Sequence, residues 1–145
     1  MIIDDAQSIE RLLRETKRIA VLGIKTEQQA FQPAFYVPQF LVEHGYDVVP
    51  VPVYYPDATV ILGKQVYRKL VDIPGDIDMV DVFRRPQDLG KHIDDILAKK
   101  PKSVWLQQGI YDDAFAEKLS ASGITVVQDR CLMVELRMRG LSNKS

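Results

Sequence analysis

Two short stretches of this sequence have the residue types needed to bind a phosphate group. Lys25 comes two residues after Gly23 at the end of the apolar run IAVLGI, and Arg84 and Arg85 follow the apolar run MVDVF. A glycine lets the backbone turn close to a phosphate, a lysine adds positive charge, and a planar guanidinium grips phosphate oxygens bidentately. A plainer interpretation stays open, in which Gly23 only ends a strand and the cations are solvated.

Polar groups also stand at the end of the apolar run SVWLQ and directly after it. Gln107, Gln108 and Gly109 can present side-chain amides and exposed backbone to a polar ligand. The alternative is an ordinary turn between a strand and a helix.

The residues that could perform catalysis are few. His44 precedes a glycine at an expected helix end, and His92 lies on a charged helix face, so both are expected to be structural or solvated. Cys131 follows Arg130, and a neighbouring cation can lower the pKa of a thiol, although a lone cysteine beside apolar residues is usually a small buried hydrophobe. The sequence contains no metal-ligand set, nucleophile elbow or P-loop.

Five short apolar runs must position these residues. They are nearly continuous rather than alternating, which is typical of strands covered on both faces. The runs are 19–24, 47–53, 79–83, 103–107 and 124–128.

Helical patterns alternate with the runs. A first helix is expected near the start, capped by Ser8, and the others are expected at 38–44, 86–100 and 112–122. This alternation predicts an α/β fold, a Rossmann-like doubly wound, mainly parallel five-stranded sheet with helices on both faces. Ligands of such sheets bind beyond the carboxyl ends of the strands, where the polar residues above are expected to lie. The segment 54–74 breaks the alternation and is a long connection that can wall a site.

A dinucleotide site is disfavoured. The first loop reads GIKTEQ instead of G-x-G-x-x-G, and no acid ends the second run, since the first acid after it is Asp57.

Composition limits the class of protein. With 145 residues and 46% apolar content we expect one domain, 1–145, with an N-terminal helical segment, 1–17, and a flexible tail, 140–145. Nineteen basic residues against 20 acidic ones give no reason to expect nucleic acid as a partner. The start MIIDDAQSIERLL is unlike a secretory signal, and no apolar run approaches the roughly 18 residues of a membrane span. One cysteine agrees with a reducing compartment, so we expect a cytoplasmic protein that does not bind membranes.

Six strings, in this order, resemble the small single-domain CoA-binding proteins, which are similar to the CoA-binding domain of the succinyl-CoA synthetase alpha subunit. The strings are AVLG, EHGYDVVPV, ILGKQVYRKLVDIP, DMVDVFRRPQDL, VWLQQGI and VVQDRC, and the resemblance covers 18–138. It implies a Rossmann-like fold that binds coenzyme A across the strand ends.

The resemblance also implies site residues. Gly23, Ile24 and Lys25 would lie at the phosphates, and Pro52, Val53 and Tyr54 near the adenosine. Val82, Phe83 and Arg84 would line the ligand, and Gln107, Gln108 and Gly109 would close the site. It implies no role for Asp129, Arg130 and Cys131 and no catalytic residue. Relatives usually have a serine and prolines in the first loop and Asn-Pro after the second strand, whereas this chain has Lys25, glutamines and Pro52-Val53-Tyr54.

The leading hypothesis is non-catalytic binding of coenzyme A or an acyl-CoA. One alternative is an enzyme or redox-responsive protein that acts on a CoA thioester or another nucleotide through Cys131. Another is a regulatory module that binds a different nucleotide and signals to a protein partner, whose identity the sequence does not reveal.

Overall fold

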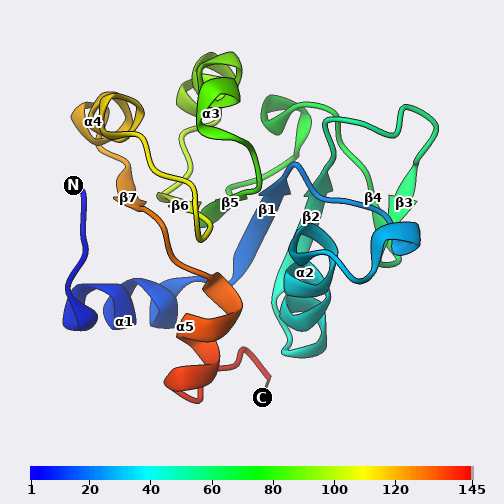
Figure 1. The fold of residues 1–145 in the computed structure, drawn as a ribbon, viewed down its shortest axis with the longest axis horizontal. Coiled ribbons are helices and arrows are strands. Elements are labelled where there is room, and N and C mark those ends of the chain that lie inside the picture. Colours follow the sequence, from blue (N-terminus) through cyan, green and yellow to red (C-terminus); the bar gives the residue numbers. More distant parts are fainter. Residues whose placement is uncertain (145) are drawn as a thin grey trace.

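A parallel five-stranded sheet in the order β2-β1-β5-β6-β7 forms the centre of the computed structural model, which describes residues 1–144. Figure 1 shows the sheet between two layers of helices. The predicted α/β class and the parallel, doubly wound sheet are confirmed. The strands are β1 (Arg18–Leu22), β2 (Asp47–Val51), β5 (Met79–Val82), β6 (Ser103–Leu106) and β7 (Thr125–Val127).

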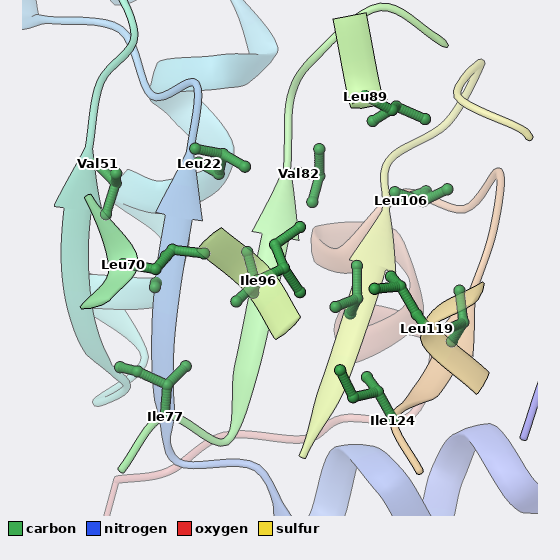
Figure 2. Close-up of a cluster of buried hydrophobic side chains, with 14 of the residues drawn as sticks. Leu22, Val51, Leu70, Ile77, Val82, Leu89, Ile96, Leu106, Leu119 and Ile124 are labelled. Carbon is green, nitrogen blue, oxygen red and sulfur yellow. The ribbon is translucent and has the colours of Figure 1, made fainter. Parts of the chain in front are cut away.

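Each face of the sheet packs against its own hydrophobic core. Helices α3 (Ile93–Lys99) and α4 (Asp113–Ala121) cover one face, and α1 (Ala6–Glu15), α2 (Pro33–Glu43) and α5 (Leu132–Met138) cover the other (Figure 1). Figure 2 shows the first core, in which Leu22, Val82 and Leu106 from neighbouring strands meet Ile96 of α3 and Leu119 of α4. Burial on both faces explains why the strands appear in the sequence as continuous apolar runs.

The direction in which the chain crosses the sheet reverses between β1 and β5. From β1 the chain passes through α2 to β2 at one edge, and it then returns to β5 on the other side of β1. Such a reversal leaves a crevice at the carboxyl ends of the two strands, because the connections leave in opposite directions.

Two helices begin at other residues than the sequence pattern indicates. The cap of α1 is Asp5, whose carboxylate accepts from the backbone N–H of Ser8 at 3.0 Å, so the expectation that Ser8 is the cap is wrong. Helix α2 begins at Pro33, five residues before the expected start, and contains Pro38 in its interior. Proline suits the first turn of a helix, and here Pro33 occupies that turn.

The expected helix 86–100 is divided. A 3₁₀ segment, η3 (Pro86–His92), precedes α3. Asp88 accepts hydrogen bonds from Arg85 and Lys91, three residues away on either side, and this spacing matches the three-residue turn of a 3₁₀ helix.

The long connection 54–74 contains a small hairpin, β3 (Val60–Ile61) paired with β4 (Lys64–Gln65), and one 3₁₀ turn, η2 (Leu70–Asp72). A further 3₁₀ turn, η1 (Glu27–Gln29), follows β1. In the C-terminal segment, the backbone N–H of Asn143 donates to the carbonyl of His44 at 2.9 Å, and residue 145 of the expected tail lies outside the described residues. Within residues 1–144, no helix has the length and apolar character needed to cross a bilayer.

Candidate functional site

The carboxyl ends of four strands meet in one row. Leu22 of β1 is in register with Val51 of β2 and Val82 of β5, and Val82 is in register with Leu106 of β6. The residues that follow these strands therefore lie side by side at one edge of the sheet. A cavity of about 480 Å³, here called the main cavity, opens at this edge, within the size range of small-molecule sites. Its lining includes Lys25, Arg84, Arg85, Gln107, Gln108, Gly109 and Cys131, with Gln32, Pro33, Ala34, Tyr36, Phe83, Pro86 and Ile110 as further walls.

A smaller cavity of about 240 Å³, the side cavity, adjoins the main one. The two share Lys25, Phe83, Arg84 and Arg85. Gly23 and the chain after β2, with Val53, Tyr54 and Tyr55, complete its lining.

Gly23 is required by the packing of β1 against β5. Its φ is +89°, and a Cβ atom at this position would overlap the carbonyl oxygen of Phe83. Its N–H donates to the carbonyl of Val51 at 2.9 Å. The glycine therefore lets three backbone segments approach each other at the edge of the side cavity.

The backbone of helix α2 positions Lys25. The N–H of Lys25 donates to the carbonyl of Ala34 at 3.1 Å. That carbonyl lacks its usual helical donor, because the residue four positions later is Pro38, which has no N–H. Among the described residues Lys25 forms no ion pair, so its ammonium group is available to a ligand of either cavity.

Arg84 lies where the two cavities meet. Only 9% of the residue is exposed, and its Nε–H donates to Nε2 of His92 at 3.0 Å. Its guanidinium carbon lies 5.6 Å from the centroid of the Tyr54 ring, a cation–π distance. The nearby guanidinium also lowers the pKa of the Tyr54 phenol, because it stabilises the phenolate. His92 is thus a partner of Arg84 rather than a solvated side chain.

Arg85 is partly neutralised. Its Nε–H donates to Asp88 at 2.8 Å, and Lys91 donates to the other oxygen of the same carboxylate at 3.0 Å. These bonds from Lys91 and Arg85 lower the pKa of Asp88 to about 2. Arg85 and Lys91 thus share one negative charge, and the cluster keeps a net positive charge beside the cavities.

Hydrogen bonds to neighbouring segments hold the turn after β6 in place. Gly109 has φ +86°, and its N–H donates to the Asp129 carboxylate at 2.6 Å. The buried Gln107 uses Oε1 to accept from the backbone N–H of Leu132 at 3.1 Å, so this side chain joins the turn to the start of α5. Gln108 is exposed at the lining of the main cavity.

The three residues 129–131, which follow β7, make different contacts. Asp129 fastens the Gly109 turn, whereas Arg130 binds the Asp4 carboxylate at 2.8 Å and so ties the N-terminal segment to the sheet. Cys131 precedes α5 and lines the main cavity, partly exposed.

Most of the residues that the resemblance implied lie at one site. Nine line one or both cavities: Gly23, Lys25, Val53, Tyr54, Phe83, Arg84, Gln107, Gln108 and Gly109. Ile24, Pro52 and Val82 are buried in the packing next to them. The walls from 32–36 and the contact of Arg84 with His92 were not anticipated. The expected helix start at Pro38 left the first turn of α2 out of the site, and Pro33 is the signal that could have found it.

The side chains that line the main cavity suit an anionic, partly aromatic ligand. Lys25, Arg84 and Arg85 supply positive charge, and Tyr36, Phe83 and Ile110 supply apolar walls. Within residues 1–144 there is no cluster of three or more His, Cys, Asp or Glu residues that could hold a metal ion.

A family model described as a CoA binding domain matches residues 17–137. The uncharacterized protein YneT of Bacillus subtilis (strain 168) is 31% identical over 126 residues, which cover 87% of this chain and 90% of YneT. A solved structure from Thermus thermophilus, cell-free ID.343, is 39% identical with a TM-score of 0.84 over 93% of this chain and 98% of the other.

A larger protein shares the fold. The dinucleotide-forming acetyl-coenzyme A synthetase 1 of Ca. Korarchaeum cryptofilum superposes with a TM-score of 0.68 at 20% identity. The match covers 81% of this chain and 26% of the synthetase, so one portion of that enzyme has this architecture.

Proposed function

The chain belongs to the CoA binding domain family, and we propose that it binds coenzyme A or an acyl-CoA at the carboxyl edge of the sheet without transforming it. The observation that carries this proposal is the convergence of Lys25 and Arg84 on adjoining cavities at the reversal point between β1 and β5. A diphosphate placed there would meet both cations.

The remaining walls suit the rest of the ligand. Val53 and Tyr54 line the side cavity, where an adenine ring can stack against the phenol. Phe83, Tyr36 and Ile110 give the main cavity an apolar surface for the pantetheine arm. In this proposal the ligand therefore runs from the side cavity, past the cations, into the main cavity.

The chain after β2 supports coenzyme A over NAD. β2 ends at Val51, and Asp57 stands in the following loop, so no acid at the strand end can grip a ribose 2′-hydroxyl. The single free cysteine agrees with the reducing cytoplasm as the setting of this function.

A melting series tests the proposal. Coenzyme A, dephospho-CoA, acetyl-CoA, NAD and NADP are compared at equal concentration, and native mass spectrometry identifies any ligand that is carried through purification. A ligand at 100 times its Kd adds about 2.7 kcal/mol and raises the melting temperature by several degrees. The proposal predicts stabilisation by CoA species and not by NAD. No shift with any CoA species at millimolar concentration would contradict it.

A second candidate function rests on the position of Cys131 in the lining of the main cavity. Its thiolate could attack the carbonyl of an acyl-CoA, forming an acyl-cysteine thioester and releasing CoA as the thiol. Acetyl-CoA should then add one acetyl group to the intact protein, as seen by mass spectrometry, and Cys131→Ser should remove this adduct. If the wild-type protein stays unmodified, this second function is excluded and binding is the remaining function.

A further inference from the structure

A histidine, rather than a close carboxylate, holds the buried Arg84. The side chain of Arg84 is 8% exposed, and the separation between its Nη2 and Oδ2 of Asp88 is 3.9 Å, too long for a hydrogen bond. Its Nε–H donates to Nε2 of His92 at 3.0 Å. Asp88 is meanwhile engaged by Arg85 and Lys91. The imidazole is therefore the hydrogen-bond acceptor that fixes the plane of the guanidinium.

This bond determines the protonation state of the ring. A guanidinium stays protonated and can only donate, so Nε2 of His92 must accept. An imidazole that accepts at Nε2 is neutral and carries its proton on Nδ1. Protonation of Nε2 would remove the acceptor and place a second positive charge against Arg84.

The charges around the ring come from three segments. Arg84 follows β5, Lys91 and Asp88 lie on η3, and Asp95 lies on α3. Asp95 accepts from the backbone N–H groups of Leu70 and Val71 in η2 at 2.8 and 3.2 Å. Both carboxylates are thus bound to other partners. Burial, and then the positive charge of Arg84, lower the pKa of His92 from its ordinary value.

We propose that His92 is a positioning residue, whose neutral Nε2 holds Arg84 toward the ligand and whose protonation weakens the binding of phosphate-bearing ligands. This inference rests on the proposed function of the cavities. When the ring is protonated, the guanidinium must turn away from it, and the orientation that places Arg84 over the Tyr54 ring, where the two cavities meet, is lost. Affinity should therefore fall as the pH falls.

Three variants test the proposal by calorimetric titration with dephospho-CoA between about pH 8 and pH 5. This probe lacks the phosphomonoester of coenzyme A, whose second pKa of about 6 would itself change the affinity. His92→Gln keeps an oxygen acceptor that does not titrate, His92→Leu keeps none, and His44→Gln is the control at the far end of α2.

We expect His92→Leu to weaken binding about tenfold at the upper pH, the cost of losing a hydrogen bond to a charged group. His92→Gln should bind nearly as well as the wild type there and lose the decline at low pH. The control should keep the wild-type profile. An unchanged pH profile in His92→Gln, or wild-type affinity in His92→Leu, would overturn the proposal.

A second measurement needs no ligand. Nitrogen-15 spectra of the imidazole rings at neutral pH, assigned with His44→Gln, should show His92 neutral with its proton on Nδ1. A ring protonated on Nε2 would overturn the positioning role. If the wild type bound no CoA species, the proposed function would fail, and these spectra alone would decide whether His92 holds Arg84.

Discussion

The backbone N–H of Lys25 donates to the carbonyl oxygen of Ala34 at 3.1 Å, an oxygen that Pro38 leaves without its helical donor. A proline inside a helix is normally costly because one i→i−4 bond is lost. Here the loop after β1 uses the freed acceptor, and this bond fixes the backbone of Lys25 beside the cavities.

Replacing this proline tests the coupling. Pro38→Ala gives Ala34 a helical donor that competes with Lys25, so the Lys25 amide should exchange with solvent faster. Hydrogen exchange followed by NMR measures this, and affinity for coenzyme A should fall with it. Unchanged protection of the Lys25 amide would show that the proline does not position the loop.

The two cations should act on a ligand through charge. Lys25→Ala and Arg84→Ala are each expected to weaken binding of coenzyme A about tenfold at low ionic strength, because each removes a charge-assisted contact to phosphate. The loss should shrink as salt is added, since salt screens the wild-type attraction. Calorimetry over a salt series measures it. Lys17→Ala removes an exposed cation before β1, at the opposite edge of the sheet, and should have no effect. An equal loss in this control would point to net charge instead of a site.

Gly23 should tolerate no side chain. Gly23→Ala combines a positive φ with overlap of the Phe83 carbonyl, so we expect a loss of about 3 kcal/mol in the free energy of unfolding. Gly63→Ala is the matched control, because its φ is +71° but nothing lies within 4 Å of the added Cβ. That variant should lose only about 1 kcal/mol. Denaturant unfolding compares them, and equal losses would refute the steric argument.

A buried carboxyl group lies in the middle of the sheet. Asp81 of β5 is fully buried, in register with Val21 and Trp105, and neither carboxyl oxygen has a hydrogen-bond partner among the described residues. Burial raises the pKa of Asp81 well above its ordinary value, so the group folds as the neutral acid.

The sign of the resulting pH dependence follows from this shift. Above the unfolded pKa of 3.8, unfolding releases the proton of Asp81, so this group makes the protein less stable as pH rises, until the folded pKa is reached. Asp81→Asn has no such proton to release. Its advantage over the wild type should be absent near the unfolded pKa and grow by up to about 1.4 kcal/mol per pH unit above it. Unfolding of both proteins across pH measures this advantage. A difference in the free energy of unfolding that stays constant with pH would contradict a neutral Asp81 in the folded protein.

The sheet was predictable because its signal is local. Each strand is buried on both faces, so SVWL and MVDV appear as apolar runs without knowledge of their neighbours. Helix α5 and the β3-β4 hairpin were missed because they are short and depend on packing. The Asp5 cap was missed because Ser8, three residues later, is an equally good capping type.

The location of the site could be predicted from the sequence, but the contacts between its residues could not. The strand-end rule locates Lys25 and Arg84, since each lies within three residues of a strand end. The partner of Arg84 was not predictable, because His92 lies eight residues away and reaches it only when η3 folds as a 3₁₀ segment. The same holds for Asp129, which meets Gly109 across two strand ends.

Mapping coenzyme A onto the protein by NMR tests the central claim most directly. Titration of nitrogen-15-labelled protein should shift the backbone amides of Gly23, Lys25, Arg84 and Gly109 at the carboxyl edge of the sheet. Asp47 begins β2 and Asp78 directly precedes β5, so both lie at the opposite edge of the sheet, and their amides should stay in place. The predicted result is chemical-shift changes that saturate with coenzyme A concentration and are confined to the carboxyl edge. No shifts at millimolar coenzyme A, or shifts centred on the opposite edge, would contradict the account.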